Sequence, residues 1–348
     1  MKPAVILAVL FFGTAFTAWS QSTESGIGFG QTKAAQWTFE DAQQMAAKGR
    51  LDQAMNVLDQ LAVQTPVPAG VQRLRGLIYY QREQLQQAAD AFAKAVAQDA
   101  NDHESAEMEG VTLFRLGRPQ DALPLLESAR TAVSKANVDP EYVLGLCYAD
   151  LARYDDARHA FATQYGFGGD SPEAYLLAGR LFLRREFRDA ATAQATKALQ
   201  LDPKLPLAHE LLAEADLARG DTDGAIRELQ AEQAINPLEA MVYDRLGDAY
   251  LRNGQYANAQ QALNRALLLE PGATAPYLML GQTFLKLNDP IEALHYLLHA
   301  AQMDPSNYIT HNLLGQAYKA TGQMEQANRE FKLVVQLQHR DDPKPAER

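Results

Sequence analysis

The sequence has a single cysteine, Cys147, among 348 residues, so the chain cannot form an internal disulfide. The count also excludes a Cys-x-x-Cys redox pair and any zinc site built from several cysteines. Cys147 lies close to Gly145 and Tyr148 in an apolar stretch, and we expect it to pack as a small buried hydrophobic residue.

Basic residues are also few, since 32 lysines and arginines face 43 aspartates and glutamates, a net charge of −11. The charge is −12 once residues 1–20, which hold one lysine and no acid, are set aside. Proteins that bind nucleic acid or anionic membrane surfaces usually present basic patches. The balance therefore argues against both ligands and is compatible with basic or neutral protein partners.

Only one long apolar run is present, residues 4–16, and Lys2 precedes it. A positive start, an apolar core and the small residues Ala18 and Ser20 are typical of a secretory signal peptide. We predict that residues 1–20 are removed and that the mature protein is periplasmic or secreted. The run is short for a membrane span of roughly 20 residues, but an uncleaved N-terminal membrane anchor remains the alternative.

The sequence lacks the familiar catalytic motifs, with no Gly-x-Ser-x-Gly and no His-Glu-x-x-His. Glu292, His295 and His299 share one face of a predicted helix, but this face points away from the packed side, so we expect no metal there. An acidic cluster over residues 99–109 surrounds a predicted helix start, where acids are favourable. We therefore predict a protein with no catalytic residues, no metal and no cofactor.

A repeat dominates the rest of the sequence. Nine alanines are 34 residues apart, apart from one step of 35: Ala54, Ala88, Ala122, Ala157, Ala191, Ala225, Ala259, Ala293 and Ala327. Small residues stand twelve positions earlier: Ala42, Gly76, Gly110, Gly145, Gly179, Ala213, Gly247, Gly281 and Gly315. A period of 34 is the length of a helix-turn-helix repeat unit. The small residues predict close helix crossings, and prolines such as Pro271 and Pro305 predict where units end.

This pattern resembles the tetratricopeptide repeat (TPR) family, and residues 243–271, 277–305 and 311–337 carry most of its signature. The resemblance covers residues 37–338 as about nine repeats, and it implies an all-α, right-handed α-solenoid superhelix of antiparallel helix pairs. It also implies an inner groove, lined by the first helix of each unit, that binds extended or helical segments of other proteins. Residues 21–36 are predicted to be a flexible leader and residues 339–348 a charged tail.

The register is irregular in three places. Residues 127–140 predict a lengthened turn, and the glycine-rich residues 163–175 predict a long turn or a hinge with Asp170 or Ser171 capping the next helix. Residues 190–232 depart most from the repeat, with Asp216 and Glu232 at positions that are usually apolar. Either Asp216 reaches solvent or a neighbour such as Arg219, or this joint is weak and allows the superhelix to flex.

By analogy with the family, certain first-helix positions should face the groove. The candidate partner-binding residues are Tyr142, Arg180, Arg184, Glu210, Glu214, Asp244, Asp248, Arg252, Gln282, Asn312 and Gln316. Four acids on two neighbouring helices predict a basic partner segment, and flanking arginines either pair with these acids or orient the partner. At the C-terminal end, an apolar strip over residues 333–337 is a second possible docking surface or simply a tolerated end.

These observations predict a non-catalytic protein-protein interaction scaffold of the bacterial cell envelope, exported and acting through its concave groove. The alternative is an accessory subunit that positions a separate envelope enzyme.

Overall fold

The computed structural model describes residues 37–130 and 140–341, and within these ranges it consists of helices and connecting turns, without a strand. The helices are α1 (Phe39–Ala47), α2 (Leu51–Ala62), α3 (Val71–Gln81), α4 (Leu85–Gln98), α5 (His103–Arg115), α6 (Pro119–Ala129), α7 (Pro140–Asp150), α8 (Tyr154–Tyr165), α9 (Pro172–Arg184), α10 (Arg188–Leu201), α11 (Ala208–Arg219), α12 (Thr222–Ile235), α13 (Ala240–Arg252), α14 (Tyr256–Leu269), α15 (Thr274–Lys286), α16 (Pro290–Met303), α17 (Tyr308–Ala320) and α18 (Met324–Asp341).

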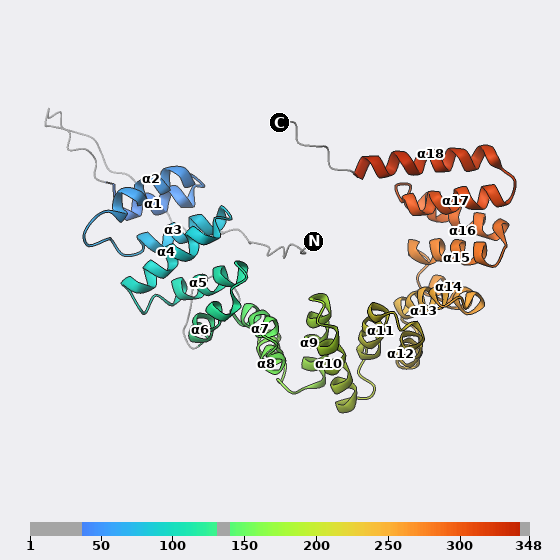
Figure 1. Cartoon of the computed structure of the whole chain (residues 1–348), viewed down its shortest axis with the longest axis horizontal. Coiled ribbons are helices and arrows are strands. Elements are labelled where there is room, and N and C mark those ends of the chain that lie inside the picture. The colour runs from blue at the N-terminus through green and yellow to red at the C-terminus, as the bar shows by residue number, and fades with distance from the viewer. Residues whose placement is uncertain (1–36, 131–139, 342–348) are drawn as a thin grey trace, which may run out of the picture.

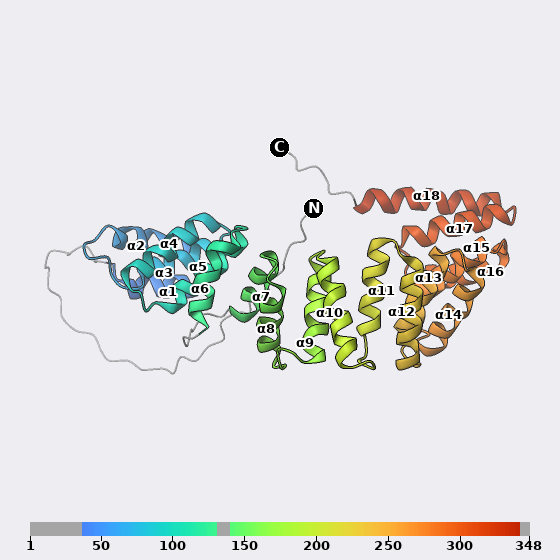
Figure 2. The ribbon, with the colours of Figure 1, turned by 60° about the horizontal axis from the view of Figure 1, so that its bottom comes forward.

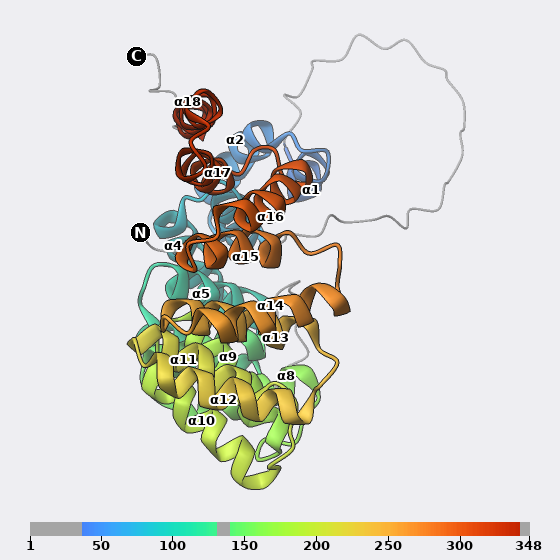
Figure 3. The ribbon, with the colours of Figure 1, turned by 90° about the vertical axis from the view of Figure 1, so that its right-hand side faces the viewer.

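The helices form nine consecutive pairs that stack along a curved line, as Figure 1 shows. Along the arc from α5 to α16 the odd-numbered helices lie toward its inside, and neighbouring odd-numbered helices, such as α13 and α15, contact one another. In Figure 2, α7 to α12 stand side by side, so the helix ends form two long edges. Figure 3 shows successive pairs in layers from α11 and α12 up to α17 and α18. The predicted all-α solenoid of paired helices is confirmed.

Close crossings within each pair explain the periodic small residues. A Cβ atom added to Gly247 would lie 2.3 Å from Cδ2 of Leu263, and one added to Gly76 would lie 2.5 Å from Cε1 of Phe92. The same relation holds for the other helical glycines of the repeat except Gly179, since each faces the large residue four positions after the periodic alanine. The predicted role of these glycines is therefore confirmed.

Gly179 shows how one irregular repeat is accommodated. Ala195 stands where the other repeats carry a large side chain, and here Leu211 of the next repeat approaches instead. A Cβ atom on Gly179 would lie 2.7 Å from Cδ2 of Leu211. Leu211 is 1 % exposed, so the core at this joint is filled from α11.

The turn inside each pair requires one residue with left-handed backbone conformation. Its nine positions follow the same period, and they are Gly49, Glu83, Gly117, Ala152, Glu186, Gly220, Gly254, Asn288 and Gly322. Glycine adopts positive φ without steric cost, whereas an ordinary residue loses roughly 1 kcal/mol there. Ala152, with φ 57°, is the simplest strained member because its side chain is a single methyl group.

We therefore expect Ala152→Gly to raise the free energy of unfolding by about 1 kcal/mol, and Gly254→Ala to lower it by a similar amount. No atom lies within 4 Å of a Cβ atom built on Gly254, so only backbone strain is tested there. Chemical denaturation of both variants beside the parent protein measures the two effects. Changes of the same sign would contradict this explanation of the turns.

The glycine-rich connection between α8 and α9 is fastened by a buried arginine. Arg158, 3 % exposed, donates hydrogen bonds to the carbonyl of Gly169 (2.8 Å) and to Asp170 (2.8 Å), and its guanidinium lies 4.1 Å from the ring centre of Tyr175. Ser171 caps α9, which is one of the two capping residues that the sequence predicted. These contacts favour a fixed long turn over a hinge.

The acids of the irregular region at 190–232 also have partners. Asp216 accepts a hydrogen bond from Arg219 at 2.7 Å, which is the first of the two predicted alternatives. Glu232 is fully buried and accepts hydrogen bonds from the backbone N–H of Leu207 (2.8 Å) and from the side chain of Asn236 (2.5 Å). Glu232 thus stabilises the turn that leads into α11, where Leu207 has φ 70°.

Other sequence predictions meet the structure only partly. Cys147 is fully buried, and burial, together with the negative charge of Asp150, raises the pKa of its thiol to about 12. In α18, Leu333, Val334 and Leu337 are half-buried, whereas Val335 is 52 % exposed. The predicted signal peptide, the leader, most of the turn at 127–140 and residues 342–348 lie outside the described residues. Within those residues, no helix combines the length and apolar character of a membrane span.

Candidate protein-binding groove

The predicted groove residues all lie on odd-numbered helices, which is where the analogy placed them. Arg180, Arg184, Arg252, Asn312 and Gln316 are exposed. The half-buried members are Tyr142, Glu214, Asp244, Asp248 and Gln282, and Glu210 is buried with 6 % exposure. The ring of Tyr142 lies 5.8 Å from that of Phe161, so this side chain takes part in the packing between α7 and α8.

Arg245 links α13 to the two glutamates of α11. Its guanidinium lies 3.1 Å from Glu210 and forms a second ion pair with Glu214. Burial raises the pKa of Glu210, and the positive charges of Arg245 and Arg180 oppose this shift. Among the described residues, Glu210 and Glu214 thus pair with Arg245, which was not among the candidate residues, and not with the flanking arginines of the prediction.

Asp248 and Arg252 form an ion pair within α13. The side chains are one helical turn apart, and Nε of Arg252 lies 2.8 Å from Oδ2 of Asp248. The exposed Arg252 makes this a surface pair, which contributes about 0–1 kcal/mol. Three of the four groove acids are therefore paired with an arginine within the protein, and Glu210 and Glu214 share the same one.

Asp244 is the exception among the four acids. The structure of the described residues gives its carboxylate no ion pair or hydrogen bond, and its Oδ1 atom is buried without a partner. Burial raises the pKa of Asp244 to about 6, and the negative charges of Asp248 and Glu270 add to the shift, while Arg245 opposes it. An uncompensated carboxyl group in a groove is a place where a partner's cation would gain a hydrogen-bonded contact.

A row of large apolar side chains also runs along the inner helices, four positions after the small residue in six of the nine repeats. Leu183, Leu217, Leu251 and Leu285 are 34 residues apart and half-buried, and Tyr80 and Phe114 occupy the same position in earlier repeats. The row offers apolar contact between the polar groove residues. The sequence analysis did not name it, although the same 34-residue period would have revealed it.

The described residues contain no group of three or more His, Cys, Asp or Glu side chains that could hold a metal ion. His299 packs against Tyr277, with ring centres 4.3 Å apart, and His295 meets Tyr296 edge-on at 5.2 Å. Both histidines are exposed, and each lies against a tyrosine ring.

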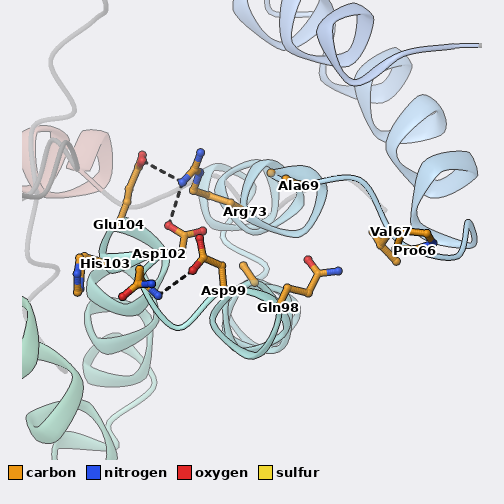
Figure 4. Close-up of a pocket in the computed structure, with 12 residues that line it drawn as sticks. Pro66, Val67, Ala69, Arg73, Gln98, Asp99, Asp102, His103 and Glu104 are labelled. Carbon is orange, nitrogen blue, oxygen red and sulfur yellow. Dashed lines mark hydrogen bonds and ion pairs between the residues drawn. The ribbon is translucent and has the colours of Figure 1, made fainter.

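The acidic cluster at 99–109 likewise has structural roles, which Figure 4 shows in part. Asp102 caps α5 by accepting a hydrogen bond from the N–H of Ser105 (3.1 Å), and it forms an ion pair with Arg73 (2.9 Å). These residues line an open hollow between the start of α3 and the connection from α4 to α5. Glu107, another acid of this cluster, is fully buried in α5.

Comparison with protein families agrees with the repeat geometry. One tetratricopeptide repeat model matches residues 240–273, and a second matches residues 46–103 and 278–337. The chain belongs to the tetratricopeptide repeat family. A model of subunit 3 of the anaphase-promoting complex, or cyclosome, also matches residues 81–164 of this TPR protein. TPR proteins are generally non-catalytic protein-interaction scaffolds.

Several solved structures are similar to parts of this TPR protein. A MamA crystal structure shares 20 % identity and a TM-score of 0.47, covering 52 % of this chain and 100 % of its own. YrrB, described as a TPR protein with an unusual peptide-binding site, shares 18 % identity and a TM-score of 0.47 over 53 % of this chain and 95 % of its own. PilF of Pseudomonas aeruginosa shares 22 % identity and a TM-score of 0.44 over 47 % and 75 %. No curated protein matches the sequence.

Proposed function

We propose that this TPR protein is a non-catalytic scaffold of the bacterial cell envelope that binds segments of other proteins along its inner groove. The signal-peptide pattern of residues 1–20 supports an exported location. The family supports binding of proteins as the general activity. An accessory subunit that positions a separate envelope enzyme is the second candidate, and it would use the same groove.

The observation that carries the proposal is the composition of the inner wall. The wall combines a row of half-buried leucines with a carboxyl group, that of Asp244, that has no partner in the described residues. Apolar contact supplies most of the binding energy in such interfaces, and a few polar groups fix orientation and partner choice. An uncompensated carboxylate lowers the stability of the fold, so packing within the fold does not explain why this wall contains one.

Site-specific photo-cross-linking in the native cells tests the proposal. A photoreactive amino acid replaces Arg180 or Asn312, which are exposed on the odd-numbered helices α9 and α17. We expect discrete cross-linked products from both positions, because a bound segment would lie along this wall.

The matched controls carry the same amino acid at Thr196 and Gln261, which are exposed on the even-numbered helices α10 and α14. These positions should give no such products. Cross-links from the controls but not from the inner positions would place the binding surface on the outer side and overturn the proposal. An enzyme among the products would favour the accessory-subunit alternative.

A further inference from the structure

Exposed large hydrophobic side chains gather on one edge of the solenoid. This edge is where odd-numbered helices begin and even-numbered helices end, and we call it the apolar edge. Its exposed members are Trp37, Val63, Tyr165, Phe167, Leu201, Leu238, Met241, Leu268, Tyr308 and Ile309. On the opposite edge the described residues expose three such side chains, Leu287, Ile291 and Met324.

The opposite edge is occupied instead by contacts between successive repeats. Arg82 pairs with Asp52 of the preceding repeat at 2.6 Å. Equivalent contacts, each spanning 30 to 35 residues, are Arg115 with Glu83, Arg185 with Asp150, Arg219 with Asp189, and Asn253 with Asp223. Exposed apolar side chains are therefore concentrated on the apolar edge, which has the larger apolar surface left to cover.

The apolar edge meets the groove in the seventh repeat. Met241, Asp244 and Asp248 share one face of α13, because they are three and four residues apart. The antiparallel pairing places the start of α13 beside the end of α14, and Glu270 lies close enough to Asp244 to raise the pKa of its carboxyl group.

We call this surface the entrance patch, and its members are Leu238, Met241, Asp244 and Glu270. Leu238 is 72 % exposed and Met241 48 %. These side chains would bury their apolar area only when another molecule lies over them. The exposed apolar residues and the unpartnered carboxyl group are two separate observations on one surface.

We propose that the entrance patch binds a cationic amphipathic segment of another protein, with its apolar side chains on Leu238 and Met241 and a lysine or arginine at Asp244. This inference rests on the proposed function, because the segment would continue from the patch into the groove.

Charge decides the kind of occupant. The connections of the apolar edge from α10 to α17 carry four acids, Asp202, Glu239, Glu270 and Asp304, against the single basic residue Lys204. An anionic membrane would be repelled by such a surface, and a second copy of this chain, with a net charge of −11, would bring further negative charge. A basic segment is the occupant that removes these repulsions.

Labelled synthetic peptides test the proposal by fluorescence anisotropy on the full chain. The probe is a short amphipathic Leu/Lys peptide, and it is compared with a Leu/Glu peptide of the same pattern and with a Ser/Lys peptide. We expect binding of the Leu/Lys peptide alone. Leu238→Ser and Met241→Ser combined should weaken it by about tenfold or more, and Asp244→Asn severalfold.

Two control variants remove comparable groups elsewhere. Val63→Ser with Tyr165→Ser removes exposed apolar side chains from distant parts of the same edge, and Asp189→Asn removes an exposed acid from the opposite edge. Both should bind the Leu/Lys peptide as the parent protein does. All substituted residues but Asp244 are exposed, and circular dichroism should show unchanged helicity.

Other results would overturn the inference. Equal affinity for the Leu/Glu peptide, or equal affinity of all variants, would show that the patch does not select a cationic segment. Loss of self-association in the double variant would identify a second copy as the occupant, and flotation with phosphatidylglycerol vesicles would identify a membrane. The cross-linking contrast between inner and outer positions is independent of these results, so the proposed function can stand where this inference fails.

Discussion

Gly247→Leu is expected to lower the free energy of unfolding by roughly 2–3 kcal/mol, the cost of overpacking a closely packed site. A Cβ atom at this position would lie 2.3 Å from Cδ2 of Leu263 and 2.5 Å from its Cγ. Leu263 is fully buried, so it cannot turn outward to make room. The crossing of α13 and α14 must therefore open, and thermal or urea denaturation would measure the loss.

Gln261→Leu is the matched control, since it introduces the same side chain at an exposed position of α14. Its effect should stay within about 0.5 kcal/mol. Hydrogen exchange would also locate the damage, because a solenoid repeat contacts mainly its neighbours and the loss should concentrate in α13 and α14. Equal stability of the two variants would show that Gly247 does not stand at a close crossing.

The sequence predicted the features that depend on one repeat at a time. The distance from Gly247 to Leu263 in the chain is the same in most repeats, so the crossing could be recognised by its spacing alone. The left-handed turns were not predicted, although glycine occupies positions such as Gly220 and Gly254, because Ala152 and Glu186 hide the pattern in other repeats. Their strain became evident only from the backbone angles.

Features that depend on two repeats together escaped the sequence analysis. Arg245 reaches from α13 to Glu210 and Glu214 on α11, and a long flexible side chain leaves no spacing signal for such a contact. The contact of Leu211 with Gly179 likewise joins two neighbouring repeats, so one repeat considered alone did not reveal it. The spacing of the candidate residues was enough to predict the groove, but the pairing of their charges could be seen only in the structure.

Asp244→Asn is expected to stabilise the fold at neutral pH, although it removes a groove residue. The pKa of Asp244 is raised from 3.8 to about 6, so the folded protein binds this proton more tightly than the unfolded chain does. Stability should therefore fall as pH rises from about 4 to 6, and above that range the charged carboxylate destabilises the fold. With allowance for partial exposure, the variant should gain on the order of 1–2 kcal/mol at pH 7.

The gain should vanish near pH 4, where Asp244 is already neutral in the parent protein. Melting curves of the parent protein and the variant across this range test the sign, with Asp189→Asn as an exposed control that should change little at any pH. An unchanged melting temperature at pH 7 would mean that water or a neighbour already compensates the carboxylate.

The same group should make partner binding depend on pH in the opposite sense. A lysine or arginine placed beside Asp244 favours its charged form, so it lowers the pKa of the carboxyl group and binds more tightly as pH rises through about 6. Asp248 and Glu270 add negative charge at the site and Arg245 adds positive charge, and none of these three needs to titrate in that range for the effect to occur. Asp244→Asn should remove this pH dependence and weaken binding while the fold becomes more stable. A substitution of Asp244 that raises stability and lowers affinity would show that the carboxylate serves partner binding. Replacing a residue that serves packing would lower stability and affinity together.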